Sequence, residues 1–364
     1  MKKKIALQTF QLSTNYGGIL QAFALQHYLT KKGFDVVHIN RAYQSNNSFL
    51  KFKIIVDKII NFNTTLAINK AESIFKVFVN KFINLSPPLY STKLWNKYIN
   101  ENKFDAVIVG SDQIWRQEYV GAFAEEFFLN FKKGKIKKIA YAASFGVDKI
   151  GNGYAKQISN QLHDFDAISV REKSGVDILQ KNFNIEAVHL IDPTLLLLSQ
   201  DYIDMFELKK DVKKPYIFAY VLDKNLHKQN MIEEVEKTLG MVSKLVYGSE
   251  VTKATYNDVD IRSKVSIETW LSHFYNADYI VTDSFHGMIF SILFNKRFIV
   301  IANESRGVSR FESMLNLIDL KEKLIFSGAN LKKETILKPI DYESINSIIE
   351  EERKLANKFI NQVF

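Results

Sequence analysis

Short apolar runs recur along this chain of 364 residues and alternate with longer segments whose apolar residues follow a helical spacing. Runs without a polar face are typical of parallel strands that helices cover on both sides. The expected strands are residues 4–10, 36–40, 104–109, 138–143, 167–170 and 188–191, followed by 216–221, 243–247, 277–281 and 298–301. Because strands joined through helices form right-handed crossovers, the pattern predicts a parallel α/β fold.

The alternation weakens through the charged segment 207–214 and then begins again. This interruption predicts two α/β domains, residues 1–205 and 206–340, that face a cleft. A last charged helix, within residues 341–364, is expected to pack back toward the first domain.

Residues 46–100 do not fit the alternation and indicate a helical insertion in the first domain. Within them, the stretch FLKFKIIVDKIINF mixes lysines with a dense set of apolar residues. Such a mixture occurs in helices that lie on a membrane surface. The alternative, which we favour, is a helical lid packed on its own domain.

Composition excludes several classes of protein. A hydrophobic content of 46% and an aromatic content of 13% are typical of a globular chain and not of a disordered one. The absence of cysteine excludes disulfides and thiolate metal sites and suits a reducing compartment. The start of the chain lacks the apolar region of a signal peptide, and no apolar stretch is long enough to span a bilayer. We therefore expect a cytoplasmic protein.

The positive charge is unevenly distributed. The chain has a formal net charge of +9, of which residues 1–199 carry +10 and residues 200–364 carry −1. A basic half indicates an anionic partner, such as a lipid surface or an acidic substrate, unless its lysines only keep the surface soluble. No basic motif with interleaved aromatic residues matches a nucleic-acid-binding module, so no nucleic-acid partner is expected.

Four polar stretches follow expected strands, and ligands of open α/β sheets bind beyond the carboxyl ends of the strands. The first is TNYGGIL, which contains Asn15, Tyr16 and Gly17. Its glycines permit close backbone approach, and the helix that follows presents free N–H groups to an anion. A plain tight turn explains the same residues equally well.

The second stretch, GSDQIWRQ, places Asp112, Gln113 and Trp115 together after a strand. A carboxylate, an amide and an aromatic ring in one place suit a sugar, whose hydroxyls need acceptors and whose ring needs a flat partner. The alternative is that Asp112 caps a helix above a core Trp115.

The third stretch, SVREKSG, contains Arg171 between a strand and a helix. Its guanidinium can hold a phosphate or a carboxylate with two hydrogen bonds, or else form a surface ion pair. In the fourth stretch, TDSFHG, residues Asp283, Ser284 and His286 precede a helix whose N-terminus would face an anion. Histidine exchanges protons near neutral pH, so we interpret His286 as functional although a structural histidine is the alternative.

The ordered set NYGGILQAFALQHYL, FDAVIVGSDQIW, IAYAASFG, ISVREKSG, LIDPTLLL and DYIVTDSFHGMIFSILFNKRFIVI resembles the polysaccharide pyruvyl transferase family. The resemblance implies two Rossmann-like domains arranged as in GT-B glycosyltransferases. It also implies transfer of a pyruvyl group from phosphoenolpyruvate to two hydroxyls of a sugar, which gives a cyclic ketal. The sugar would belong to a bacterial capsule, cell-wall or exopolysaccharide unit or to its lipid-linked precursor, and the enzyme could touch the inner face of the membrane.

The resemblance also assigns roles to residues. It ties Arg171 and His286 to donor binding and catalysis. The chemistry of the reaction adds Asp112 or Asp283 for the second proton and the helix start at Gly287 to face the donor. The acceptor is expected beside Asn15, Tyr16, Gly17, Asp112, Gln113 and Trp115. No metal and no cofactor besides the donor substrate are expected, because no cluster of His and Asp has metal-ligand spacing.

The sequence departs from the family at Ser284, where several members carry an arginine. Arg306 and Arg310 in NESRGVSRF are the candidates to supply the missing donor-binding cation. Two alternatives to a pyruvyl transferase remain: a GT-B glycosyltransferase that uses a nucleotide sugar, and a non-catalytic glycan-binding relative.

Overall fold

The computed structural model describes residues 2–42, 62–132, 134–211, 214–249, 260 and 264–364. The first of its two sheets has the strand order β2-β1-β3-β4-β5-β6, and all of its neighbouring strands pair in parallel. The strands are β1 (Lys4–Gln8), β2 (Asp35–His38), β3 (Ala106–Val109), β4 (Lys137–Ala143), β5 (Ala167–Val170) and β6 (Val188–His189). The helices of this part of the chain are α1 (Tyr16–Lys31), α3 (Phe62–Phe82), α4 (Thr92–Glu101), α5 (Gln117–Val120), α6 (Ala124–Phe127), α7 (Asn152–His163), α8 (Lys173–Phe183) and α9 (Ser199–Met205).

The second sheet has the order β11-β10-β9-β7-β8 and is also parallel. Its strands are β7 (Tyr216–Val221), β8 (Val242–Tyr247), β9 (Tyr279–Thr282), β10 (Arg297–Ile301) and β11 (Leu324–Ile325). The helices are α10 (Leu226–Leu239), α12 (Ile267–Asn276), α13 (Phe285–Leu293), α14 (Ser309–Leu317), α15 (Lys333–Leu337) and α16 (Tyr342–Val363). The prediction of two parallel α/β domains is confirmed, while their limits at residues 205 and 340 stay predictions.

Each sheet has a point where the strand order reverses. In the first sheet the chain moves outward in opposite directions from β1 and β3, and in the second from β7 and β9. Crossover helices lie on opposite faces of the sheet on the two sides of such a point, so a crevice opens beyond the carboxyl ends of those strands. Three of the four polar stretches singled out in the sequence follow such strands, namely β1, β3 and β9, and the fourth follows β5.

Local capping decides where the helix after β9 begins. The sequence suggests a buried helix from Met288, but α13 begins at Phe285. The reason is Ser284, whose side-chain oxygen accepts a hydrogen bond from the N–H of Gly287 and so caps the helix three residues earlier. His286 therefore lies in the first turn of α13 instead of in a loop.

The described part of the insertion packs on the first domain. Phe75 and Phe78 of α3 are buried, and Phe78 contacts Phe23 of α1 with the ring centroids 5.7 Å apart. Ala71 of α3, however, lies in the apolar core of the second domain, so α3 packs on both domains and not on its own domain alone. The stretch FLKFKIIVDKIINF lies outside the described residues except for its last position.

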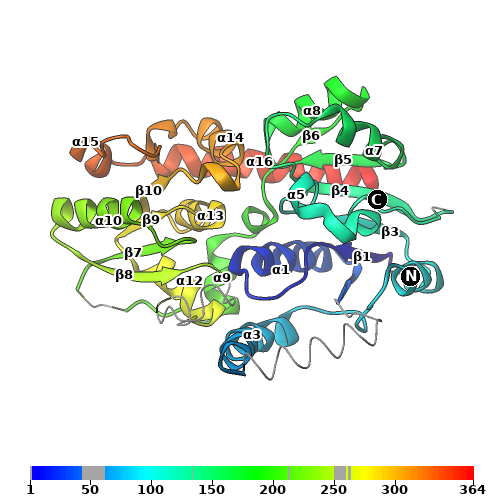
Figure 1. Ribbon diagram of the computed structural model, residues 1–364, viewed down its shortest axis with the longest axis horizontal. Coiled ribbons are helices and arrows are strands. Elements are labelled where there is room, and N and C mark those ends of the chain that lie inside the picture. Colours follow the sequence, from blue (N-terminus) through cyan, green and yellow to red (C-terminus); the bar gives the residue numbers. More distant parts are fainter. Residues whose placement is uncertain (1, 43–61, 133, 212–213, 250–259, 261–263) are drawn as a thin grey trace.

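The last helix connects the two domains. At its start Tyr342 donates a hydrogen bond to the carbonyl of Lys296, next to β10. Further along, Arg353 donates to the carbonyls of Leu195 and Leu197, and Phe359 contacts Tyr141 of β4. Figure 1 shows α16 running from the second domain along the first, as the sequence predicts.

Candidate active site

A cavity of about 520 Å³ lies between the two domains, beyond the carboxyl ends of both sheets. The first domain contributes Phe10, Asn15, Asp112, Gln113 and Tyr119, and the second contributes Leu222, Asp223, Gly248, Ser249, Ser284, Phe285, His286, Arg306 and Arg310. These residues follow β1, β3, β7, β8, β9 and β10, which include the strands where the order of each sheet reverses. The cavity is therefore where a ligand of this fold is expected.

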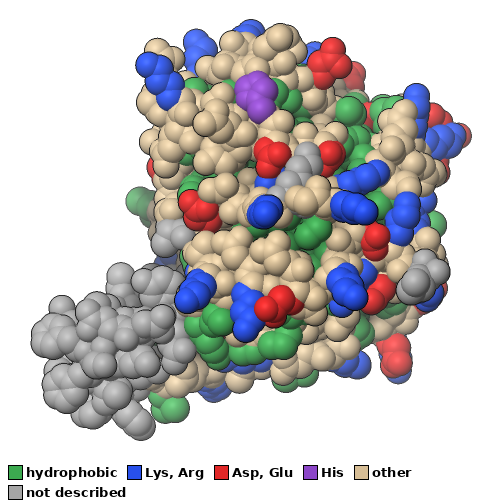
Figure 2. All heavy atoms as spheres, turned by 90° about the vertical axis from the view of Figure 1, so that its right-hand side faces the viewer, with side chains coloured by type: hydrophobic (Ala, Val, Ile, Leu, Met, Phe, Trp, Pro, Cys, Tyr) green, Lys and Arg blue, Asp and Glu red, His purple; other side chains and the backbone are tan. Residues whose placement is uncertain are grey.

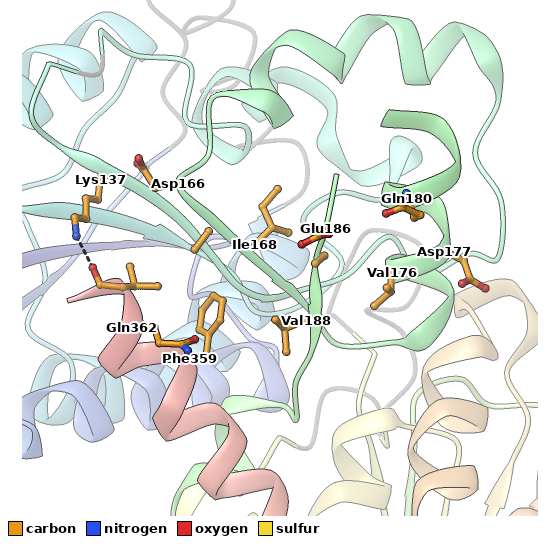
Figure 3. Close-up of a pocket in the computed structure, with 13 residues that line it drawn as sticks. Lys137, Asp166, Ile168, Val176, Asp177, Gln180, Glu186, Val188, Phe359 and Gln362 are labelled. Atoms are coloured by element: carbon orange, nitrogen blue, oxygen red, sulfur yellow. Dashed lines mark hydrogen bonds between the residues drawn. The ribbon is translucent and has the colours of Figure 1, made fainter. Parts of the chain in front are cut away.

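A larger cavity, of about 760 Å³, lies at the edge of the first sheet, between β5, α8 and α16. Figure 3 shows Phe359 and Gln362 of α16 beside this edge, with Lys137 and Asp166 at the starts of β4 and β5. Lys137 and Asp166 lie at the amino ends of their strands, whereas ligands in such sheets bind beyond the carboxyl ends. Its lining includes none of the predicted site residues, so we place the candidate active site between the domains.

His286 is held by groups of the first domain although it belongs to the second. Its side chain is 8% exposed, and its Nε2 lies 3.5 Å from Oδ2 of Asp192. On its other edge, a Cβ added to Gly17 would lie 2.0 Å from Nδ1 of the ring, so only a glycine fits at that position of α1. The ring is thus fixed between the two domains and borders the cavity.

Asp192 is a buried carboxylate that contacts both His286 and Arg171, and it does not belong to the four polar stretches of the sequence. Its Oδ1 accepts hydrogen bonds from the N–H and the hydroxyl of Thr194, and its Oδ2 accepts one of 2.8 Å from Arg171. Burial would raise the pKa of Asp192, but the charges of His286 and Arg171 hold it well below its usual range. Asp192 therefore stays ionised and joins the predicted histidine to the predicted arginine.

Asp112 is the carboxylate that the first domain contributes to the cavity wall. Its Oδ1 lies 3.4 Å from Nη2 of Arg171 and accepts a hydrogen bond from the N–H of Gln113. Burial opposes ionisation, but the charges of Arg171, His286 and Arg310 lower the pKa of Asp112. The residue has φ of 76°, a left-handed conformation that aspartate tolerates better than most residues and that is frequent at functional sites.

Arg310 is a cation on the cavity wall that has no carboxylate within salt-bridge distance among the described residues, although the charges of Asp112 and Glu172 act on it from further away. Its residue is 6% exposed, its Nη2 donates to the backbone carbonyl of Arg306, and its Nε has no partner among the described residues. Burial, and after it the charge of Arg171, lowers the pKa of Arg310 to about 10. A charge that is buried without a counter-ion is costly, so an anion in the cavity would relieve that cost.

Arg306 also lines the cavity, but it has a counter-ion. Its Nη2 and Nε donate to Oδ1 and Oδ2 of Asp223 at 2.9 and 3.2 Å, which is a bidentate pair. Both side chains are 40% exposed. Of the two arginines proposed from the sequence, Arg310 is therefore the one available to an anionic ligand.

The comparison with known families agrees with this geometry. A family model described as polysaccharide pyruvyl transferase matches residues 15–305. The chain belongs to the polysaccharide pyruvyl transferase family. No curated protein matches the chain.

Solved structures with the same fold include sugar-nucleotide enzymes. UDP-N-acetylglucosamine 2-epimerase from Rickettsia bellii has a TM-score of 0.55 at 13% identity, covering 100% of this chain and 96% of that one. The enzyme from Methanocaldococcus jannaschii, in complex with UDP-GlcNAc and UDP, has a TM-score of 0.52 at 15% identity, covering 97% and 94%. At these identities the likeness shows the fold alone, which is the GT-B arrangement.

Several residues predicted from the sequence lie off the cavity wall of this family member. Trp115 is 0% exposed, and its indole N–H donates to the carbonyl of Phe127. Tyr16 is also 0% exposed; its hydroxyl donates to the carbonyl of Val265, and its ring stacks on Trp270. The prediction that these rings contact a sugar is wrong for this structure, because apolar packing encloses both of them.

Three further predictions change for related reasons. The Arg171 guanidinium lies behind Phe285, 4.5 Å from the ring centroid, and is committed to Asp192 and Asp112 instead of reaching the cavity. Asp283 is 1% exposed and pairs with Lys228 at 2.5 Å, so it holds the end of β9 in place. Gly287 is a glycine because a Cβ would lie 2.2 Å from Oγ1 of Thr282, and not because a ligand approaches it.

The predicted residues that the structure brings together on the cavity wall are Asn15, Asp112, Gln113, Ser284, His286, Arg306 and Arg310. Within the described residues, no group of three or more His, Asp or Glu side chains is arranged to hold a metal ion. Over the same ranges, no helix combines the length and apolar character needed to cross a bilayer.

Proposed function

We propose that this chain transfers the pyruvyl group of phosphoenolpyruvate to two hydroxyls of a sugar in a bacterial surface polysaccharide or its lipid-linked precursor. The observation that carries this proposal is Arg310, a buried cation that forms no salt bridge within the described part of the chain and lines the same cavity as His286. The N-terminus of α13 adds N–H groups beside it. Together they suit a small donor that carries a phosphate and a carboxylate.

The reaction transfers two protons and breaks one bond to phosphate. A proton is added to C3 of phosphoenolpyruvate, which makes C2 electrophilic. One sugar hydroxyl attacks C2, phosphate leaves as its C–O bond breaks, and the second hydroxyl closes the ketal. The two hydroxyls lose two protons, of which one ends on C3 and the other on the released phosphate.

The geometry suggests how the groups divide this work. His286 borders the cavity, and histidine is the side chain that most often serves as a general acid or base, so we assign it the proton that goes to C3. Asp112 has a lowered pKa and stays ionised, which suits a carboxylate that accepts a hydrogen bond or a proton from an attacking hydroxyl. Arg171 and Asp192 hold these two groups in place from behind the wall.

The family resemblance leaves one cation to be replaced at Ser284. Ser284 uses its side-chain oxygen to cap α13, and Arg310 comes from α14 to the same wall. We infer that Arg310 takes over the charge that other members carry at the position of Ser284. The scheme requires no metal and no further cofactor.

We also propose that the protein works in the cytoplasm, with a lipid-linked acceptor held at the inner face of the membrane. The support is the +9 charge of the chain, concentrated in the first half. On the face of the first domain drawn in Figure 2, Lys and Arg side chains are interspersed with Asp and Glu. That distribution favours a weak peripheral contact over a strong one.

The test combines donor binding with donor turnover. Calorimetry should detect binding of phosphoenolpyruvate, and phosphate should be released from it when lipid-linked sugars or p-nitrophenyl glycosides are present. Stabilisation by UDP-GlcNAc without any by phosphoenolpyruvate would favour a nucleotide-sugar glycosyltransferase. Binding of glycosides without phosphate release would identify a non-catalytic glycan-binding relative.

A further inference from the structure

The cavity extends beyond the groups that suit the donor. Its wall also includes Leu222, Asp223 and Ser249 of the second domain and Tyr119 of the first, and we call this part of the wall the second end. Phosphoenolpyruvate is small compared with a cavity of about 520 Å³, so this second end has room for a sugar ring. Resting on the function proposed above, we propose that the second end binds an uncharged sugar ring of the acceptor, between Tyr119 and the Asp223–Ser249 pair.

Tyr119 supplies the flat surface that a sugar ring needs. It is 40% exposed, whereas Trp115, four residues earlier in the same stretch, is 0% exposed. The Arg116 guanidinium lies 4.9 Å from the centroid of the Tyr119 ring, which helps to fix its orientation. An aromatic ring that is exposed, oriented and part of a cavity wall offers apolar contact area at little entropic cost, because a tyrosine has few side-chain rotamers.

Asp223 supplies an acceptor that does not move. Arg306 holds both of its oxygens, Ser249 donates to Oδ1 at 3.1 Å, and Asn303 donates to Oδ2 at 3.3 Å. The carboxylate nevertheless stays 40% exposed toward solvent. A rigid carboxylate beside a guanidinium and a hydroxyl presents an acceptor and donors together, which matches sugar hydroxyls that act as both.

The charge at this end favours an uncharged ring over an acidic one. Arg306 and Asp223 neutralise each other, in contrast to Arg310 at the donor end. Burial would raise the pKa of Asp223, but the hydrogen bonds and charge of Arg306 lower it, so the carboxylate is ionised. A second anion beside it would therefore be repelled. The two ends of one cavity thus select an anionic donor and a neutral acceptor ring.

The test uses methyl α- and β-glycosides of glucose, galactose, mannose and N-acetylglucosamine as probes, with binding followed by saturation-transfer NMR. Tyr119→Ala should weaken the best-bound glycoside about tenfold, and Tyr119→Phe should retain its affinity. Tyr90→Ala is the matched control, because Tyr90 is similarly exposed, at 38%, and lies outside the cavity wall. Asp223→Asn should weaken the same glycoside, because it loses the charge that accepts the hydroxyls.

Phosphoenolpyruvate affinity, measured by calorimetry on the same variants, separates this proposal from the function on which it rests. Glycoside binding that depends on Tyr119 without any binding of phosphoenolpyruvate supports the sugar subsite and overturns the donor assignment. Glycoside affinity that is unchanged in Tyr119→Ala, or absent in the parent protein at millimolar concentration, overturns the sugar subsite. A glycoside lost equally in Tyr90→Ala overturns it too.

Discussion

Two Asp–Arg pairs belong to the site, one behind the cavity wall and one in it, and they differ in burial. Asp192 and Arg171 have side chains that are 0% and 1% exposed, whereas Asp223 and Arg306 are both 40% exposed. The buried pair stands behind the wall and positions His286 and Asp112, while the exposed pair forms part of the wall itself. The same kind of ion pair therefore positions other side chains where it is buried, and is open to contact with a ligand where it is exposed.

The largest expected effect is a difference in stability between the variants Asp192→Asn and Asp223→Asn. Asp192→Asn leaves Arg171 buried with a weaker counter-charge and should lower the free energy of unfolding by about 3–5 kcal/mol. Asp223→Asn disrupts a half-exposed pair, which solvent screens, and should cost about 0–1 kcal/mol. Urea unfolding of the two variants measures both values, and equal losses would show that burial does not separate the pairs.

The contribution of Asp192 should also depend on pH. Its pKa in the folded protein lies below that of an unfolded aspartate, about 3.9, so its stabilisation is complete above that value and is lost as the pH falls. The difference in Tm between the parent and Asp192→Asn should be constant above about pH 5 and shrink below about pH 4. A difference that grows in acid would contradict the assignment.

Turnover should depend most on the residue that the buried pair positions. His286→Asn keeps some hydrogen bonding but cannot exchange a proton, so phosphate release should fall by about 10²-fold or more while the Tm stays near that of the parent. If the variant unfolds, the ring between Gly17 and Asp192 is part of the core. If it turns over at the parent rate, the proton comes from another group, with Asp112 next in position.

Donor affinity should separate the two arginines on the wall. Arg310→Gln removes the cation without a counter-ion and should weaken phosphoenolpyruvate about 10- to 100-fold, the value of one charge-assisted hydrogen bond. Arg306→Gln, its matched control four residues away, should change that affinity by less than about threefold because its charge is already neutralised. Calorimetry of phosphoenolpyruvate binding to both variants checks this contrast. A larger loss of affinity in Arg306→Gln than in Arg310→Gln would contradict it.

The smallest effect on donor binding is expected for Arg171→Lys. Because Arg171 lies behind Phe285 and off the wall, donor affinity should change by less than about threefold. Turnover should fall more than donor affinity, because one guanidinium contacts both Asp112 and Asp192 and a lysine ammonium cannot replace both contacts in the same geometry. A large loss of affinity with unchanged turnover would show that Arg171 reaches the donor after all, through a movement of Phe285.

The sequence predicts the fold well because apolar periodicity reports directly on burial. The two parallel sheets and the final helix follow from that pattern, while the domain limit at residue 205 stays a prediction. The start of α13 was placed three residues late, because a single serine side chain moved the cap. Caps depend on one hydrogen bond, which periodicity does not detect.

The structure places several of the predicted strand-end residues on the cavity wall, but it does not place the predicted aromatic rings there. His286, Asp112 and Arg310 lie on the wall because carboxyl ends of parallel strands meet there. Trp115 was expected on the wall as well, but its large apolar ring is more stable in the core, and the exposed Tyr119 took its place. Asp192 was missed although LIDPTLLL follows a strand, because the sequence does not show that its carboxylate meets groups far away in the chain.

The helix α16 has a mechanical consequence. Its 22 residues form a rod about 33 Å long whose start is attached beside β10 and whose end is attached to β4 and to the loop after β6. Unlike a flexible linker, a continuous helix that is attached to both domains resists bending between them. We therefore expect the two domains to move less freely relative to each other than they would across a flexible linker.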